Sequence, residues 1–179
     1  MKPIRTTSNI KDPYAKRILS NILDKDPFAV YKRTPAALKR LVGGFKDRDL
    51  RKPVAKGKWS VAQIVSHLCD AELVTAFRYR MVIAQPGCRI QSYDQDKWAR
   101  SLRYDSAGCR RKLDLFIRIR EENIALLGSL TSKEWKRYGM HQERGKETLE
   151  RMVQMIAGHD LNHLKQIAQF GKALRTGKR

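Results

Sequence analysis

Two histidines one helical turn apart are the residues of this sequence best placed to do chemistry. His159 and His163 lie in the string HDLNH, inside residues 149–170, which contain no proline and repeat apolar residues at helical spacing. Positions i and i+4 project from the same face of a helix, so both imidazoles can approach one point. Neutral ring nitrogens are preferred ligands of divalent ions of the zinc or nickel type, so the pair is a candidate metal site.

A third histidine, His67, lies in a second apolar helical segment, WSVAQIVSHLCDAEL, and could supply a ligand from across an interface. Three histidine ligands leave coordination positions open for water or substrate, as in catalytic metal sites. The alternative is that a pair at i,i+4 only packs or forms hydrogen bonds. The metal is favoured because all three rings lie on apolar stripes, where an unsatisfied polar group costs about 1–3 kcal/mol and a shared ion would satisfy them together.

The segments that carry these histidines belong to a predicted all-α chain. Four major helices are expected, at residues 35–42, 61–84, about 107–129 and from 149 onward, with Thr34, Ser60, Ser106 and Thr148 as their N-caps. Pro35 would take the first helical position of the first of them. A short helix is expected at residues 131–137, while residues 88–105 and 139–147 read as irregular, and no strand-like alternation is visible. Four amphipathic helices are most simply buried as a four-helix bundle.

Length and composition indicate one globular domain. The chain has 179 residues, of which 41% are hydrophobic and 31% charged. We expect a loose N-terminal arm at residues 1–12, a single domain at residues 13–175 and a basic tail at residues 176–179. No segment reads as membrane-spanning or as a secretory signal, and the three widely spaced cysteines form no disulfide framework. A cytoplasmic protein is the simplest expectation.

The net charge of +20 is the second strong signal of the sequence. Residues 32–58 hold ten Lys or Arg against two Asp, which favours attraction to polyanions or to small anionic substrates. No helix-turn-helix, zinc-finger or RNP pattern accompanies the charge. A solvated basic surface and a weak, non-specific nucleic-acid surface both remain open.

An ordered set of short motifs resembles the DinB superfamily of DinB/YfiT-like metalloenzymes. The set comprises Trp59-Ser60, HLxDxE at 67–72, YDxDxW at 93–98, HxERG at 141–145 and HDxxHLxQI at 159–167. The motifs follow the order of the family and cover residues 27 to 175. The resemblance implies a four-helix bundle with one long crossover connection, a metal held by His67, His159 and His163, and a homodimer.

The same resemblance implies a metal-dependent enzyme acting on a small molecule. Members of the family include S-transferases that use a low-molecular-weight thiol, which the metal would hold as the nucleophilic thiolate. A metal-dependent hydrolase is chemically as natural for three histidines and a water. The competing class is a basic polyanion-binding module without catalysis, which a steep salt dependence of nucleic-acid binding would favour.

Six further residues are candidates for places around the metal or its pocket. Gln166, one turn after His163, could orient that ring by a hydrogen bond, and His141 could line the mouth of the pocket. Asp160 reads as a carboxylate behind the ligands or at the surface. Glu72 could hold an imidazole N–H from a neighbouring helix or pair with an arginine. Tyr93 and Trp98 could form a pocket wall, although packing in the core is the simpler role for both.

Overall fold

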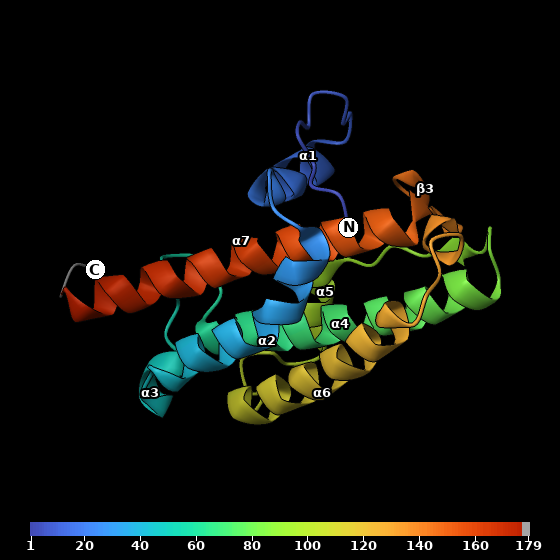
Figure 1. Ribbon diagram of the computed structural model, residues 1–179. Coiled ribbons are helices and arrows are strands. Elements are labelled where there is room, and N and C mark those ends of the chain that lie inside the picture. Colours follow the sequence, from blue (N-terminus) through green and yellow to red (C-terminus); the bar gives the residue numbers. More distant parts are fainter. Residues whose placement is uncertain (177–179) are drawn as a thin grey trace.

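Four long helices form the body of the computed structural model, which describes residues 1–176 (Figure 1). They are α2 (Pro27–Gly43), α4 (Val61–Ala84), α6 (Cys109–Gly128) and α7 (Leu149–Arg175). The shorter helices are α1 (Pro13–Leu19), α3 (Asp47–Leu50) and α5 (Gln95–Ser101), with 3-10 turns η1 (Ser20–Ile22) and η2 (Glu134–Lys136). The predicted four-helix bundle is therefore confirmed.

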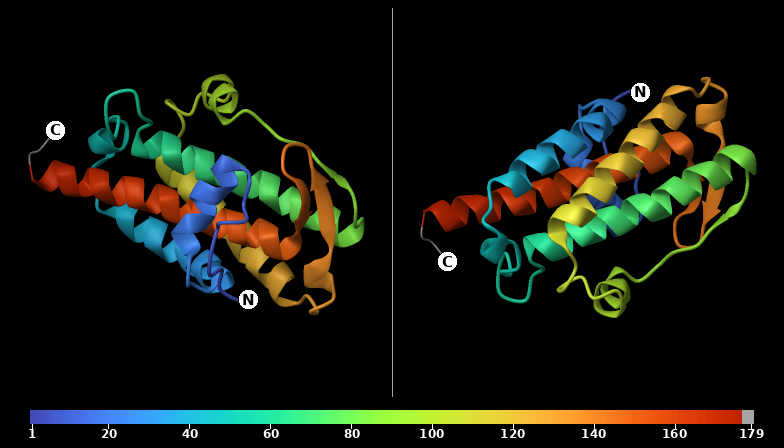
Figure 2. Two further views of the ribbon diagram at one scale, coloured as in Figure 1. Left: turned by 90° about the horizontal axis from the view of Figure 1, so that it is seen from above. Right: turned by 90° about the horizontal axis from the view of Figure 1, so that it is seen from below.

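The bundle pairs helices that run in the same direction. Helix α4 packs along α6 and α2 packs along α7, and the two pairs run in opposite directions (Figures 1 and 2). Because α4 and α6 are parallel, residues 85–108 between them return along the length of the bundle and form the expected crossover (Figure 2). Helix α7 thus lies antiparallel to α4, and the histidines of both helices can meet at one level.

Local capping explains where most of the long helices begin. Ser60 and Gln63 form a reciprocal capping box at the start of α4, and the Thr148 hydroxyl accepts the Arg151 N–H at the start of α7, as predicted. The predicted start of α6 was wrong, because Gly108 occupies the cap position and the Ser106 hydroxyl donates to the Arg103 carbonyl instead.

The predicted start of α2 at Thr34 was also wrong. Asp26 caps the helix by accepting the backbone N–H groups of Phe28 and Ala29, and Pro27 takes the first position. Pro35 therefore lies inside the helix, and its missing N–H leaves the carbonyl of Tyr31 without its helical partner. Arg120 Nη1 from α6 donates to that oxygen at 2.9 Å, so a tertiary contact satisfies the group that proline leaves unpaired.

A small three-stranded sheet closes one end of the bundle, where the sequence predicted only loops. Strand β2 (Tyr138–His141) pairs in parallel with β1 (Arg89–Ile90) and antiparallel with β3 (Gly145–Thr148). Four-residue strands are too short for a visible alternation, which explains the error. Gly139 is needed because a Cβ there would collide with the side chain of Ile90. The segment 88–105 also contains α5, which Asp94 caps.

Helix α1 lies across α7 (Figure 2). Gly158 permits this approach, since a Cβ at that position would collide with the backbone carbonyl of Ile18. In the arm before α1, Ile4 forms an isolated bridge with Leu23, and Thr7 is buried. The domain boundaries stay a prediction, and residues 177–179 of the predicted tail lie outside the described residues. Among the described helices, none is long and apolar enough to cross a membrane.

Candidate metal centre

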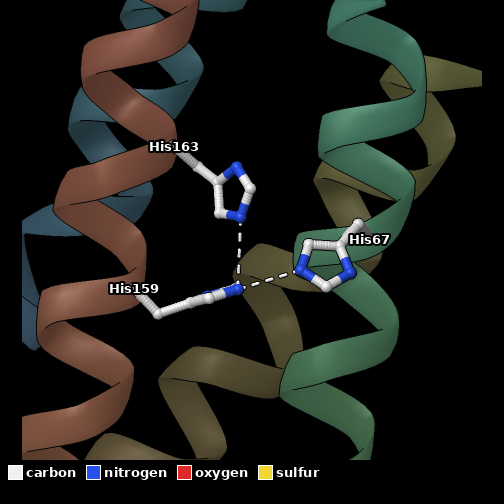
Figure 3. Close-up of side chains that lie close together, drawn as sticks. All are labelled: His67, His159 and His163. Atoms are coloured by element: carbon white, nitrogen blue, oxygen red, sulfur yellow. Dashed lines mark hydrogen bonds between the residues drawn. The ribbon is translucent and has the colours of Figure 1, made fainter. Parts of the chain in front are cut away.

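The three predicted histidines converge in the core between α4 and α7 (Figure 3). His159 Nε2 lies 2.9 Å from His67 Nε2 and 3.2 Å from His163 Nε2. The ring planes of His67 and His159 are inclined at 62°, so the two rings do not stack. The Nε2 atoms of the three histidines point toward one another (Figure 3). All three side chains are buried.

Hydrogen bonding to Gln166 sets the tautomer of His163. Gln166 Oε1 lies 2.9 Å from His163 Nδ1, and an amide oxygen can only accept, so Nδ1 carries the proton. The Nε2 atom of His163 therefore presents a lone pair to the other two rings. This is the contact that the spacing of Gln166 predicted, and it is the usual way in which a ligating imidazole is oriented.

Hydrogen bonds among the rings alone leave the cluster incompletely satisfied. A neutral imidazole has one N–H, so His159 Nε2 can donate to only one of its two neighbours. A divalent ion would accept all three lone pairs, and tetrahedral ligands at 2.0–2.1 Å would stand roughly 3.3 Å apart, close to the nitrogen separations in the cluster. The donor set therefore fits a zinc- or nickel-type ion.

Burial keeps the three rings in the neutral form that a metal requires. Desolvation is the main cause for each ring: it lowers the pKa of His67 to about 3, that of His163 to about 4 and that of His159 well below its usual range. The charge of a protonated neighbouring ring adds to the effect for His67 and His159. Trp59 contributes to this burial by packing edge-on against His67 with ring centroids 5.1 Å apart.

These pKa shifts predict that the metal-free protein loses stability as the pH falls below about 6.5. The unfolded chain binds protons on its histidines near the ordinary pKa of 6.5, whereas folded His163 stays neutral down to about 4. Between these two pKa values, each such histidine reduces the free energy of unfolding by up to about 1.4 kcal/mol per pH unit. Denaturant unfolding of chelator-treated protein at about pH 7.5 and about pH 5.5 measures the loss. The glutamine in His163→Gln cannot titrate, so this variant should lose less free energy of unfolding between the two pH values. A loss equal to that of the native protein would contradict the lowered pKa of His163.

A pocket of about 350 Å³ opens beside the cluster and is lined by His67 and His159. His141 from β2 and Tyr93 from the crossover also line it, so both predicted pocket residues are placed there. Trp98 does not line this pocket. Its ring packs against that of Tyr93, with ring centroids 4.5 Å apart, and Trp98 borders a separate groove along α4 and α6. His163 instead faces a further pocket of about 660 Å³ together with Trp59 and Gln166.

Glu72 and Asp160 do not contact the histidines but hold a buried arginine. Arg120 Nη2 donates to Glu72 Oε2 at 2.7 Å, and Arg120 Nη1 donates to Asp160 Oδ2 at 2.8 Å. Tyr31 and Asn123 donate to the remaining oxygen of Glu72 at 2.6 and 2.7 Å. The idea that Glu72 holds an imidazole was therefore wrong, and its alternative, an arginine partner, is correct. Asp160 is likewise not a surface carboxylate.

Several residues near the site were missed by the sequence analysis. Arg120 left a readable signal, because it interrupts the apolar stripe of α6 between Phe116 and Leu127. Arg17, on α1, and Arg78, on α4, line the pocket beside the histidines and left no comparable signal. Their positions depend on how α1 docks on α7 and on the register of α4, which no local pattern encodes.

Comparison with known proteins gives consistent matches over most of the chain. The sequence profile of the DinB superfamily matches residues 31–167. The chain is 28% identical to YfiT of Bacillus subtilis over 81% of this chain and 82% of that protein, and 26% identical to a relative in Geobacillus kaustophilus over 80% and 82%. Both relatives are named "putative metal-dependent hydrolase".

A solved structure of YfiT matches the fold as well as the sequence. It superposes on this chain with a TM-score of 0.77 at 26% identity, covering 100% of this chain and 95% of the other. That structure is described as a probable metal-dependent hydrolase with an unusual four-helix bundle topology. The parallel pairing of α4 with α6 and of α2 with α7 is the topology seen here.

Proposed function

The chain belongs to the DinB superfamily, and on that premise we propose that it is a metal-dependent enzyme acting on a small molecule. The observation that carries the proposal is the convergence of His67, His159 and His163, whose Nε2 atoms cannot all be satisfied by one another. The pocket of about 350 Å³ beside two of these rings offers room for a substrate.

The three histidines would hold zinc or nickel and leave positions free. A divalent ion in such a site lowers the pKa of a water or thiol that it contacts, so it makes a nucleophile available at neutral pH. Gln166 would keep His163 in the required tautomer, and the packing of Trp59 on His67 would keep bulk water away from that ring.

Two reactions, hydrolysis and transfer to a thiol, are compatible with this proposal. Hydrolysis is supported by the names of the relatives. Transfer to a low-molecular-weight thiol is supported by the resemblance to the DinB superfamily, whose members include S-transferases. The two differ in the nucleophile, water or thiol, that would enter through the pocket. The sequence and geometry support both equally at the histidines themselves.

Turnover assays with zinc- or nickel-loaded protein test the proposal. Activated esters and amides report hydrolysis, and an electrophile consumed only in the presence of added thiol reports transfer. We expect one of the two activities, with loss in His163→Ala and retention in Lys165→Ala, a neighbouring exposed residue of the same helix. Absence of both activities in fully loaded protein across these panels would contradict the enzymatic proposal.

The basic surface supports weak polyanion binding as a second candidate function. Lys39, Arg40, Lys46 and Arg48 are all exposed on or beside α2 and α3, and the chain carries a net charge of +20. Retention on heparin with a steep salt dependence, in protein without turnover, would favour this binding module over the enzyme.

The oligomeric state and location complete the proposal. The family resemblance supports a homodimer, which sedimentation measurements would test. The free cysteines Cys69, Cys88 and Cys109 support a reducing, cytoplasmic location.

A further inference from the structure

The pocket beside His67 and His159 is rich in hydrogen-bond donors that come from separate parts of the chain. Helix α1 supplies Arg17 and Tyr14, helix α4 supplies Arg78, and β2 supplies His141. The docking of α1 at Gly158 places both side chains in the pocket that His67 and His159 also line. The charge of Arg17 reaches that cluster, since it contributes to lowering the pKa of both His159 and His163.

The guanidinium groups of Arg17 and Arg78 have no carboxylate partner within 4.0 Å among the described residues. Arg17 lies over the ring of Tyr14 at 5.4 Å. Arg78 donates to the carbonyl of Gln91 and lies 5.8 Å from the ring centroid of Tyr93. Both charges are therefore positioned by aromatic rings and a neutral oxygen, which leaves them available to a ligand.

The carboxylates in and beside the pocket form no ion pair with Arg17 or Arg78 among the described residues. Glu147, beside the pocket, is already paired with Arg144, with contacts of 2.6 and 3.1 Å. Asp12 accepts the Ala15 N–H at 2.6 Å as the N-cap of α1. Glu143 is exposed and forms no ion pair with Arg78 among the described residues; burial lowers the pKa of Arg78, and the charges of Glu147 and Glu143 offset only part of that shift.

His141 adds a neutral donor to the same pocket. Its Nδ1 accepts the backbone N–H of Glu143 at 3.2 Å, so the ring proton of the neutral form resides on Nε2. Burial and the nearby charge of Arg144 lower the pKa of His141, which favours that neutral form. The Tyr93 hydroxyl also stays protonated, because burial raises its pKa to about 12.

We infer that this pocket binds a small organic oxyanion, a carboxylate or a phosphate monoester, through Arg17 and Arg78, with the rest of the molecule directed toward His67 and His159. Paired guanidinium donors suit both anions, because their N–H groups match two oxygens at once. Calling this ligand the substrate rests on the proposed function; the anion site itself needs no metal. The inference thus narrows the substrate class to acids.

Binding to chelator-treated protein tests the inference separately from catalysis. The probes are benzoate and phenyl phosphate, with the neutral benzamide as a control of similar shape, titrated calorimetrically at constant ionic strength. We expect saturable binding of at least one anion, and binding of benzamide to be weaker by roughly tenfold or more, as expected for a charge-assisted contact.

Matched arginine variants locate the binding. Arg17→Gln and Arg78→Gln should each weaken the binding of the anion by roughly tenfold. Arg111→Gln, in the separate groove along α4 and α6, should leave the affinity unchanged. Circular dichroism confirms that each variant is folded. Saturable binding of neither anion, equal affinity for benzamide, or equal effects of all three variants would overturn the inference. Anion binding by a protein that takes up no divalent ion on reconstitution would overturn the proposed function alone.

Discussion

Replacing His159 with alanine is expected to remove the divalent ion from the protein while the helical bundle stays folded. His159 Nε2 is the central atom of the cluster, 2.9 Å from His67 and 3.2 Å from His163, so its loss leaves two ligands on different helices. Because even residues that only support a ligand change metal affinity by 10–100-fold, we expect a loss of more than about a hundredfold. Competition titration with a chromophoric chelator measures the affinity.

The fold of His159→Ala should persist because the core of the bundle does not depend on the ion. Apolar clusters lie on both sides of the histidines, including Ile64, Leu68 and Phe116 on one side and Leu149 and Val153 on the other. His141→Ala is the matched control, since it removes a buried imidazole of the pocket that is outside the cluster. Loss of helical circular dichroism in His159→Ala, or equal metal loss in both variants, would contradict this assignment.

Replacing Arg120 with methionine is expected to destabilise the protein by about 3–5 kcal/mol, the usual result of removing one partner from a buried ion pair. Arg120 is fully buried and holds Glu72 and Asp160, so the variant leaves two carboxylates in the core without their counter-ion. It also leaves the Tyr31 carbonyl, already deprived of its helical partner by Pro35, without a donor. Denaturant unfolding at neutral pH measures the loss.

The exposed pair of Arg110 and Asp47 provides the comparison for Arg120. These residues contact each other at 2.8 Å, but both side chains are more than half exposed, so solvent screens the interaction. Arg110→Met should therefore change the free energy of unfolding by no more than about 1 kcal/mol. Similar losses in the two variants would show that the buried network does not stabilise the bundle as described.

The histidine site could be predicted from the sequence because its ligand spacing is local. His159 and His163 are one turn apart on a single helix, and Gln166 follows His163 by three positions, so helical geometry alone places them together. His67 required the additional step of pairing two apolar helices. His67 meets the pair because α4 and α7 each bury the stripe that carries the histidine.

The environment of the site could not be predicted, because it depends on contacts between distant segments. From the sequence, Glu72 could contact an imidazole or an arginine. The packing of α6 beside α4 brings Arg120 into contact with it. Pro35 was misplaced at a helix start because its cost in the interior is offset by that same arginine, 85 positions further along the chain. The sheet was missed because its strands are short and rely on β1 from the crossover for a partner.

Elemental analysis of protein purified without a histidine tag tests the central claim most directly. The account predicts about one divalent ion per chain, zinc or nickel, after purification or after reconstitution and removal of excess metal. His159→Ala analysed in parallel should contain much less, whereas His141→Ala should match the native protein. Native protein that remains metal-free after reconstitution with zinc, nickel and other divalent ions would contradict the assignment of His67, His159 and His163 as a metal centre.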